Sequence, residues 1–261
     1  MNPQIPTRDK KGYYVDPETG LKLKSVTTLL SQGCPKPGLI YWAGNTVAQT
    51  AIDNLPYLTK ATLKKETRLE AYEWLRRAHT RKKNERGDIG TTVHKIIEAF
   101  ILDTTLPEIH PEITGYIDQF LLCVKEFDIE FTASEMTVFN YAAGYAGTLD
   151  WMANIPGYGH VMGDTKTGKG VYAEAGMQMS AYRNAEMAWL RNGQKVPVPH
   201  TDTAVVLHLS ENTYELIPVQ TNNAVYEKFR TVIDMAEWMN ETSKTVVGQK
   251  LTPITTHGKA A

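Results

Sequence analysis

Two aspartates and a lysine gather in one short stretch of the sequence, Gly144 to Gly170. Asp150 stands in an apolar run that precedes the turn-forming residues 156–159, and Asp164 and Lys166 stand in the apolar run that follows. This pattern predicts a β-hairpin with a Gly/Pro connection. Because side chains alternate between the two faces of a strand, Asp164 and Lys166 point the same way, and the hairpin brings Asp150 beside them.

The resulting cluster of two carboxylates and one ammonium predicts a metal site. Partly buried charges cost free energy unless they are paired or bind something. A divalent cation bound between Asp150 and Asp164 satisfies both carboxylates at once. Lys166 then faces whatever the metal holds.

Four further side chains are candidates for the same site. His94 opens a helix expected from about Thr91, and Glu135 stands on a strand expected from about Phe131. Gln178 and Tyr182 are four residues apart on a helix expected over 173–191, so they share one face. Each has an ordinary alternative: a helix cap or surface residue for His94, a solvated carboxylate for Glu135, and hydrogen-bonding residues at the core edge for the other two. The order of the four elements along the chain is the specific signal.

Residues 60–86 are strongly basic and rich in helix formers, with a cluster of cations near their end: Arg76, Arg77, Arg81, Lys82, Lys83 and Arg86. One interpretation is a solvated amphipathic helix. The other is a nucleic-acid-facing arm, because clustered Lys and Arg neutralise phosphates and release counterions. The segment 87–90, with two glycines, is expected to end this arm before the next helix starts.

The other elements follow from turn residues and apolar spacing. We expect a loose lead-in at 1–12, a hairpin at 13–24 and a short helix at 26–30 that is capped by Ser25. Two longer helices are expected at 38–54 and 111–126, and two strands at 203–209 and 214–219. A last helix is expected at 223–242, followed by an irregular tail from Gly248. No internal repeat, low-complexity block or linker divides the chain. One domain of 261 residues with helical additions at its N-terminal side is therefore expected.

The composition limits the class of protein only broadly. The formal net charge is −1, so a basic face and an acidic site offset each other. Two cysteines, Cys34 and Cys123, leave a single disulfide open but no disulfide framework. The first residues carry no apolar segment typical of a secretory signal, and no apolar run reaches the length of a membrane span. A reducing cytoplasm is the expected compartment.

Several of these segments together resemble the PD-(D/E)XK nucleases of the RecB type, close to phage exonucleases and the mitochondrial genome-maintenance exonuclease. The matching motifs are GTTVH (90–94), GTLD (147–150), GDTKTG (163–168) and QMSAY (178–182). The segment SVTTLLSQG…GLIYWAG is similar to the N-terminal part of the phage enzymes. The resemblance covers most of residues 13–210.

This resemblance implies an α/β fold with a restriction-endonuclease-like core, in which a central mixed sheet is flanked by helices. It implies a single nuclease domain, with an N-terminal helical or arch region at 1–86 and the core at 87–247. By the same resemblance the metal ligands are His94, Asp150, Asp164 and the Thr165 carbonyl, with Glu135 as a further candidate. Lys166 is then the catalytic lysine, and Gln178 and Tyr182 help to hold the DNA strand and order the site. Iron–sulfur relatives use four cysteines, so this chain, with two, is expected to lack that cluster.

The activity implied is hydrolysis of DNA phosphodiester bonds with Mg²⁺ or Mn²⁺, in phage-type recombination, repair or genome processing, in the host cytoplasm if a phage encodes the chain. A histidine ligand favours Mn²⁺. Three roles are open for Lys166: orienting the attacking water, deprotonating it, or offsetting transition-state charge. The basic arm and the aromatic residues Tyr13, Tyr14, Tyr41 and Trp42 are expected to form a wall over the site that admits a single strand from its end. The alternatives are a structure-specific DNA endonuclease or resolvase and a non-catalytic DNA-binding subunit. A metalloprotein that does not act on nucleic acid is a third alternative, against which the basic arm argues.

Overall fold

The computed structural model describes residues 5–252. Within them, one mixed sheet has the strand order β7-β6-β3-β4-β5-β8-β9, with β2 added beside β4 and β1 beside β2. The strands are β1 (Tyr13–Val15), β2 (Lys22–Ser25), β3 (Glu130–Asn140), β4 (Tyr145–Ile155), β5 (Gly159–Lys166), β6 (Met187–Trp189), β7 (Lys195–Pro197), β8 (Thr203–Leu209) and β9 (Tyr214–Pro218). The β5–β8 and β2–β4 pairs are parallel, and the other pairs are antiparallel.

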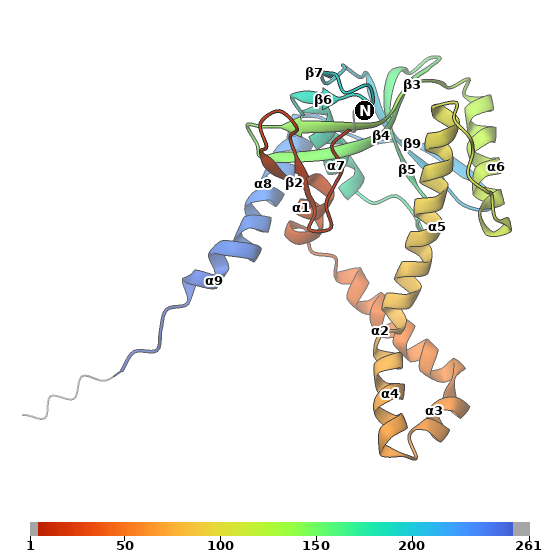
Figure 1. Cartoon of the computed structure of the whole chain (residues 1–261), viewed down its shortest axis with the longest axis vertical. Helices are drawn as coiled ribbons and strands as arrows, with labels where there is room; N and C mark the ends of the chain where they lie inside the picture. Colours follow the sequence, from red (N-terminus) through yellow and green to blue (C-terminus); the bar gives the residue numbers. More distant parts are fainter. Residues whose placement is uncertain (1–4, 253–261) are drawn as a thin grey trace, which may run out of the picture.

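Helices cover both faces of this sheet, so the architecture is α/β with a mixed sheet (Figure 1). They are α1 (Val26–Gly33), α2 (Pro37–Asp53), α3 (Leu55–Ala61), α4 (Lys65–Arg76), α5 (Ala78–Ile101), α6 (Pro111–Glu126), α7 (Glu174–Arg183), α8 (Asn223–Glu237), the π-helical turn η1 (Trp238–Thr242) and α9 (Ser243–Val246). Alternation along the strands sends neighbouring residues to opposite layers. Met152 packs with α1, α7 and α8, whereas Trp151 packs with α5 and α6.

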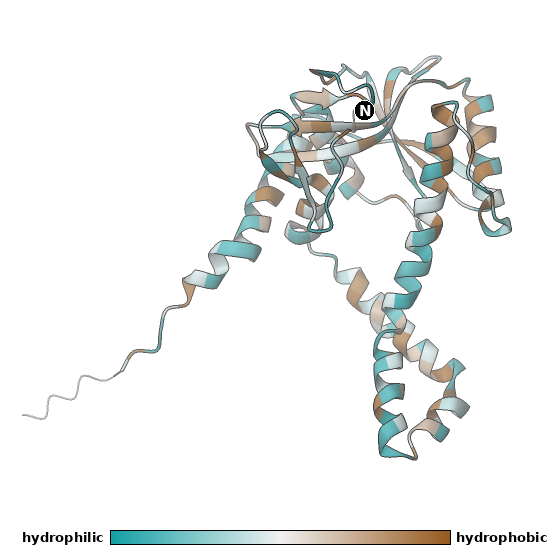
Figure 2. Ribbon diagram, viewed as in Figure 1, coloured by the Kyte–Doolittle hydropathy of each residue, from teal (hydrophilic) through white to brown (hydrophobic). Residues whose placement is uncertain are grey.

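Helices α2, α3, α4 and the first half of α5 stand away from the sheet and form the projection seen in Figure 1, which we call the arch (residues 37–87). No residue of α2 is buried, and Ile40 and Tyr41 are about three-quarters exposed. Figure 2 shows α5 changing from hydrophilic in the arch to more hydrophobic beside the sheet. The arch therefore gains little from the main core and presents most of its surface to solvent.

The sequence-based expectation of a helix boundary at 87–90 is wrong. Helix α5 runs without a break from Ala78 to Ile101, so His94 lies in its interior and not in a first turn. Each glycine costs a helix about 1 kcal/mol, but the apolar spacing that buries Val93 already begins at Ile89, which packs against the same core. The arch and the sheet are thus joined by one continuous helix.

The prediction of a helix over 173–191 is also wrong for the second half of that range. Helix α7 ends at Arg183, and Met187–Trp189 instead forms a strand that pairs with β3. A hydrogen-bonded place in the sheet outweighs the local helix preference of these residues. The helix expected over 223–242 is α8, but its last turn is the π-helical η1.

The basic segment 60–86 is not one helix, because it is divided among the end of α3, α4 and the start of α5. The remaining elements agree with their expected positions to within a few residues, including the Ser25 cap, whose hydroxyl accepts from Thr28 N at 3.1 Å. The described part of the lead-in, residues 5–12, is attached to strand β3, since the Thr137 hydroxyl donates a hydrogen bond to the Pro6 carbonyl at 2.8 Å. Residues 248–252 carry no regular structure, and the rest of the expected tail, with residues 1–4, lies outside the described residues. Cys34 and Cys123 are both free, so the single disulfide left open by the sequence is absent. Among residues 5–252, the apolar stretches of the helices are too short to cross a bilayer.

Candidate active site

The β4–β5 hairpin brings its two aspartates into one site, as its sequence predicts. Trp151 pairs with Gly163, so Asp150 and Asp164 occupy neighbouring positions on adjacent strands. Asp150 Oδ2 accepts a hydrogen bond of 2.7 Å from the backbone N–H of Thr165. The Asp164 side chain is almost fully buried, whereas that of Asp150 keeps some contact with solvent.

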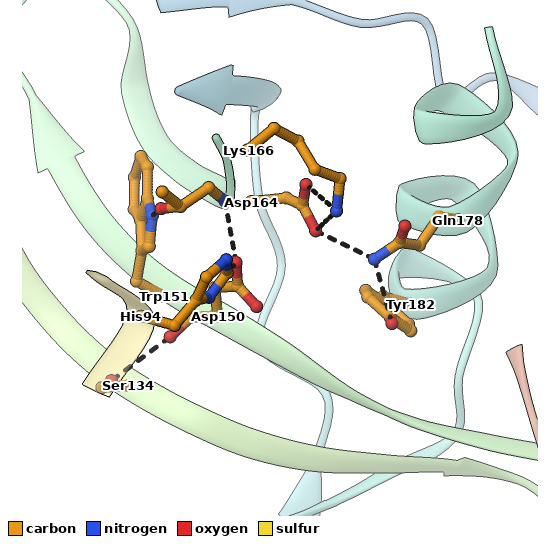
Figure 3. A network of polar contacts seen from close by, with 9 residues as sticks. His94, Ser134, Asp150, Trp151, Asp164, Lys166, Gln178 and Tyr182 are labelled. Carbon is orange, nitrogen blue, oxygen red and sulfur yellow. Dashed lines mark hydrogen bonds and ion pairs between the residues drawn. The ribbon is translucent and has the colours of Figure 1, made fainter. Parts of the chain in front are cut away.

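Asp164 is held by side chains from its own strand and from α7 (Figure 3). Lys166 Nζ lies 2.9 Å from Asp164 Oδ1 and 2.6 Å from Oδ2. Gln178 Nε2 donates to Asp164 Oδ1 at 2.9 Å and to the Tyr182 hydroxyl at 3.2 Å. Asp164 Oδ2 is buried and accepts no hydrogen bond of good geometry, so its contact with Lys166 is an ion pair alone. Both oxygens of this carboxylate are therefore in contact with Lys166 or Gln178.

A second cluster lies on the Asp150 side of the site. His94 Nδ1 is 3.3 Å from Asp150 Oδ2. One ligand atom from each of His94, Glu135 and Asp150 falls within 4.8 Å of the other two, which is the spacing needed to share one ion. Asp164 is outside this tight group because its carboxylate is turned toward Lys166 and Gln178. The residue that joins it is Glu135, the weakest of the sequence-based metal candidates.

Glu135 reaches the cluster through an unusual backbone. Its φ is +50°, in the left-handed region that non-glycine residues rarely adopt. The register pairs Ser134 with Trp151 and Met136 with Leu149, so Glu135 stands across from Asp150. Such a conformation costs on the order of 1–3 kcal/mol and is found most often at functional sites. The surrounding sheet must supply that free energy to hold Glu135 in place.

Two motif glycines make room for the large side chains around the site. A Cβ on Gly147 would lie 2.4 Å from Tyr182 Cε1, and a Cβ on Gly163 would lie within 2.1 Å of the Trp151 ring. Trp151 in turn donates to Thr165 Oγ1 at 3.1 Å, on the layer of the sheet that faces α5 and α6. These positions therefore need glycine for close packing and not for a turn.

Burial and the nearby charge of Asp150 raise the pKa values of Glu135 and Asp164. Removal from water, with the charge of Asp150 nearby, raises the pKa of Glu135 to about 7. The same two causes, burial first, raise the pKa of Asp164 above its ordinary range, against the opposing attraction of Lys166. Burial lowers the pKa of Lys166, but the charges of Asp164 and Asp150 outweigh it and raise this pKa overall. Such a group of acids gains free energy when a cation neutralises it.

A cavity of about 500 Å³ opens beside the cluster, between α5 and the end of β5. Arg86, His94 and Lys95 line it from α5, and Glu135 and Lys166 line it from the sheet. Gly90 allows the approach of Thr167, whose Oγ1 would lie 3.0 Å from a Cβ at that position. The cavity therefore places His94 and Glu135 of the cluster beside three cationic side chains, those of Arg86, Lys95 and Lys166.

The sequence-based candidates fall into the two groups just described, Asp164 with Lys166, Gln178 and Tyr182, and Asp150 with His94 and Glu135. Thr165 is buried between the two aspartates. Of the aromatic residues that were expected to form a wall over the site, not all are exposed enough to contact a DNA base. Tyr14 is buried, with its hydroxyl 2.9 Å from Thr148 Oγ1, whereas Tyr41 is exposed in the arch.

Two supporting residues were not predicted from the sequence. Trp151 braces Thr165, and the Ser134 hydroxyl donates to the Asp150 carbonyl at 3.2 Å. The alternation of a strand already sets Trp151 on the layer opposite to Asp150. The strand alternation that places Trp151 was visible in the sequence, although it does not identify Thr165 as the hydrogen-bond partner of Trp151.

Comparisons with known proteins found a weak structural likeness and no matching family. No protein-family model and no curated protein matches the sequence. Among solved structures, the chain is similar to the crystal structure of SSO0001, with 15% sequence identity and a TM-score of 0.27. The match covers 48% of this chain and 55% of that one, so the chain spans about half the length of that protein. A likeness of this extent carries no argument about function.

Proposed function

We propose that this chain is a divalent-metal-dependent deoxyribonuclease with a restriction-endonuclease-like core, which acts as an exonuclease on single-stranded DNA or DNA ends. The observation that carries the proposal is the convergence of Asp150, Asp164 and Lys166 from one hairpin. Lys166 also lines the neighbouring cavity, together with Arg86 and Lys95 from α5. Acidic groups beside basic ones suit a site that must bind both a cation and a phosphate.

The residues present fit a divalent cation. Asp164 is buried and paired with Lys166 at 2.6 Å, and the neighbouring carboxylates of Glu135 and Asp150 add negative charge that a cation would balance. His94, Glu135 and Asp150 would hold the ion, with Asp164 and the Thr165 carbonyl beside them. Carboxylates suit Mg²⁺ and Mn²⁺, and the imidazole favours Mn²⁺. When bound, the ion supplies a polarised phosphate and a water molecule of lowered pKa.

Lys166 contributes charge at the reacting phosphate. The charges of Asp164 and Asp150 raise its pKa and so favour the ammonium form. As an ammonium it orients the attacking water or offsets charge that builds on the phosphate oxygens. The ion pair with Asp164 holds the ammonium within reach of the attacking water and of the phosphate oxygens.

The arch delivers the strand to this cavity along α5. Lys82, Arg86, Gly90 and His94 follow at intervals of four residues, so they lie along one face of one unbroken helix. Arg86 and His94 are thus separated by about 12 Å along the axis. Cations of this face neutralise successive phosphates, and exposed aromatic side chains of the arch such as Tyr41 and Tyr72 stack on unpaired bases.

The experiment follows cleavage of end-labelled single- and double-stranded DNA in Mg²⁺, Mn²⁺ or EDTA. Asp164→Ala and Lys166→Ala are expected to lose cleavage and keep most DNA binding. Asp118→Ala, at an exposed carboxylate on α6, is the matched control and is expected to cleave normally. Persisting activity in Asp164→Ala would move the site elsewhere, and persisting activity in EDTA would contradict the dependence on a metal.

Closed single-stranded circles test the requirement for an end. An exonuclease leaves them intact while it degrades the linear strand of the same sequence. Circles cut as fast as linear strands would make the chain an endonuclease. DNA binding without cleavage under any of these conditions would make it a binding subunit.

A further inference from the structure

A second cavity, of about 240 Å³, meets the first one at Lys166, which among residues 5–252 is the single residue that lines both. Its wall is formed by α1, by the loop that follows β5 and by the first turns of α7, with Lys36 at its side. A strand whose phosphate lies at Lys166 must continue beyond it, and this cavity is contiguous with that position. The cavity lies outside the metal cluster, because none of His94, Glu135 or Asp150 lines it.

The wall of this second cavity offers one unused acceptor and one cation. The hydrogen bonds of Gln178 in the described part of the chain both leave from its amide nitrogen, toward Asp164 and Tyr182. Its carbonyl oxygen accepts none of the bonds found there and is not one of the fully buried unpaired atoms, so this acceptor remains open to the cavity. Lys36 is paired with Glu174 at 2.6 Å, and both side chains remain partly exposed. A ligand with donor groups and negative charge fits this combination.

Tyr172 stands at the rim with its side chain free. It is 67% exposed, in the loop between β5 and α7, and it packs into none of the three clusters of buried residues. A large aromatic ring exposed beside a polar cavity is poorly explained by fold stability, since its burial contributes little. A ring in this position is suited to stacking on a planar ligand group, and every nucleobase has such a face.

We propose that this second cavity binds the nucleotide adjoining the scissile phosphate, with Tyr172 stacked on its unpaired base. Gln178 Oε1 accepts a hydrogen bond from an amino or imino group of that base, and Lys36 leaves Glu174 to contact the next phosphate. The inference rests on the proposed nuclease function and adds a base-binding subsite to it. It assigns Tyr172 a role in substrate binding that the acidic cluster does not provide.

The test combines a tyrosine variant with a missing base. A set of end-labelled single strands carries one abasic residue at successive positions, and each is bound to the full-length chain in EDTA and scored by fluorescence anisotropy. We expect one position at which the abasic residue weakens binding by the wild-type chain about 5- to 100-fold. Tyr172→Ala is expected to weaken binding of the intact strand by a similar factor and to show no further loss with the abasic strand. Tyr172→Phe is expected to bind like the wild type.

Tyr158→Ala is the matched control, because Tyr158 is another exposed tyrosine, on the β4–β5 turn, and it is expected to leave both affinities unchanged. Equal affinities of Tyr172→Ala and the wild type, or an abasic effect that persists in Tyr172→Ala, would overturn the subsite. If those results accompany metal-dependent cleavage that Asp164→Ala abolishes, the nuclease function stands without the subsite. A wild-type chain that neither binds nor cleaves any strand would remove both.

Discussion

The amide nitrogen of Gln178 lies 2.9 Å from Asp164 Oδ1, so a side chain on α7 fixes a carboxylate on β5. The same nitrogen reaches the Tyr182 hydroxyl one helical turn later. Asp164 is therefore oriented before any ligand arrives, with one oxygen committed to Gln178 and the other beside Lys166. Preorganisation of this kind is what a metal ligand needs, because its reorientation would otherwise cost binding free energy.

Gln178→Leu is expected to weaken Mn²⁺ binding and cleavage by about 10- to 100-fold, since groups that orient metal ligands contribute that much. The fold should persist, because leucine keeps most of the volume. Titration of Mn²⁺ against cleavage rate measures the shift. Gln220→Leu, at an exposed glutamine, is the control. A Gln178→Leu chain with unchanged metal dependence would mean that Asp164 needs no support from α7.

Gly147→Ala is expected to destabilise the chain by about 1–3 kcal/mol, the usual cost of overpacking. Its Cβ would stand 2.4 Å from the Tyr182 ring and push that ring, and with it Gln178, away from Asp164. Urea unfolding measures the loss of stability, and cleavage should fall with it. Gly44→Ala is the control, because a Cβ there meets no atom within 4 Å and lies inside α2. A stable, fully active Gly147→Ala chain would contradict this explanation of the motif.

Helix α5 is expected to act as a rigid connection between the arch and the site. Gly87→Pro should break it, at a local cost of about 3 kcal/mol, while Gly87→Ala should keep it or strengthen it by up to about 1 kcal/mol. A Cβ at position 87 meets nothing within 4 Å, so neither change causes a direct clash by that atom. We expect Gly87→Pro to weaken single-strand binding and leave the unfolding midpoint of the sheet core nearly unchanged. Equal DNA affinity of the two variants would show that continuity of α5 is unimportant.

The hairpin turn at Asp16 predicts a dependence of stability on acid pH. Burial alone would raise the pKa of Asp16, but hydrogen bonds from the Tyr141 hydroxyl and from the N–H groups of Thr19 and Glu18 outweigh it and lower this pKa to about 2. Because the folded pKa lies below the unfolded value, the stabilisation is full above pH 4 and is lost as the pH falls toward 2. Asp16→Asn should cost on the order of 2 kcal/mol at pH 7.

Urea unfolding of the wild type and of Asp16→Asn at pH 7, 4 and 2 checks this dependence. The difference in the free energy of unfolding should shrink between the last two conditions. Asp118→Asn serves as the exposed control, with no difference at any pH. A difference that stays constant down to pH 2 would mean that the charge of Asp16 is not what stabilises the turn.

The sequence predicted the parts of this fold that local chemistry determines. The β4–β5 hairpin, α6 and β8 follow from turn residues and apolar spacing, and with them the neighbourhood of Asp150 and Asp164. The strand Met187–Trp189 was missed because it exists only through its pairing with β3. The continuity of α5 was missed because two glycines outweighed, in the prediction, the apolar spacing that begins at Ile89.

The candidate site divides in the same way. Motif spacing was sufficient to single out Asp164, Lys166 and Gln178, whose contacts follow from one strand and one helix face. Glu135 was the weakest candidate, yet it completes the group with His94 and Asp150. Its position depends on a positive φ in β3, and no propensity of glutamate predicts that conformation. A residue held by strain from its neighbours is visible only once the sheet is assembled.

Phosphodiester hydrolysis by this chain requires the acidic cluster to bind a divalent cation. Anomalous scattering from crystals of the full chain soaked in Mn²⁺ locates such an ion. We predict a manganese ion in direct contact with carboxylate oxygens of Asp150 and its neighbours in the cluster, and no ion there in crystals of Asp150→Ala. A wild-type crystal with no ion at Asp150, or with its only ion elsewhere on the chain, would contradict the account.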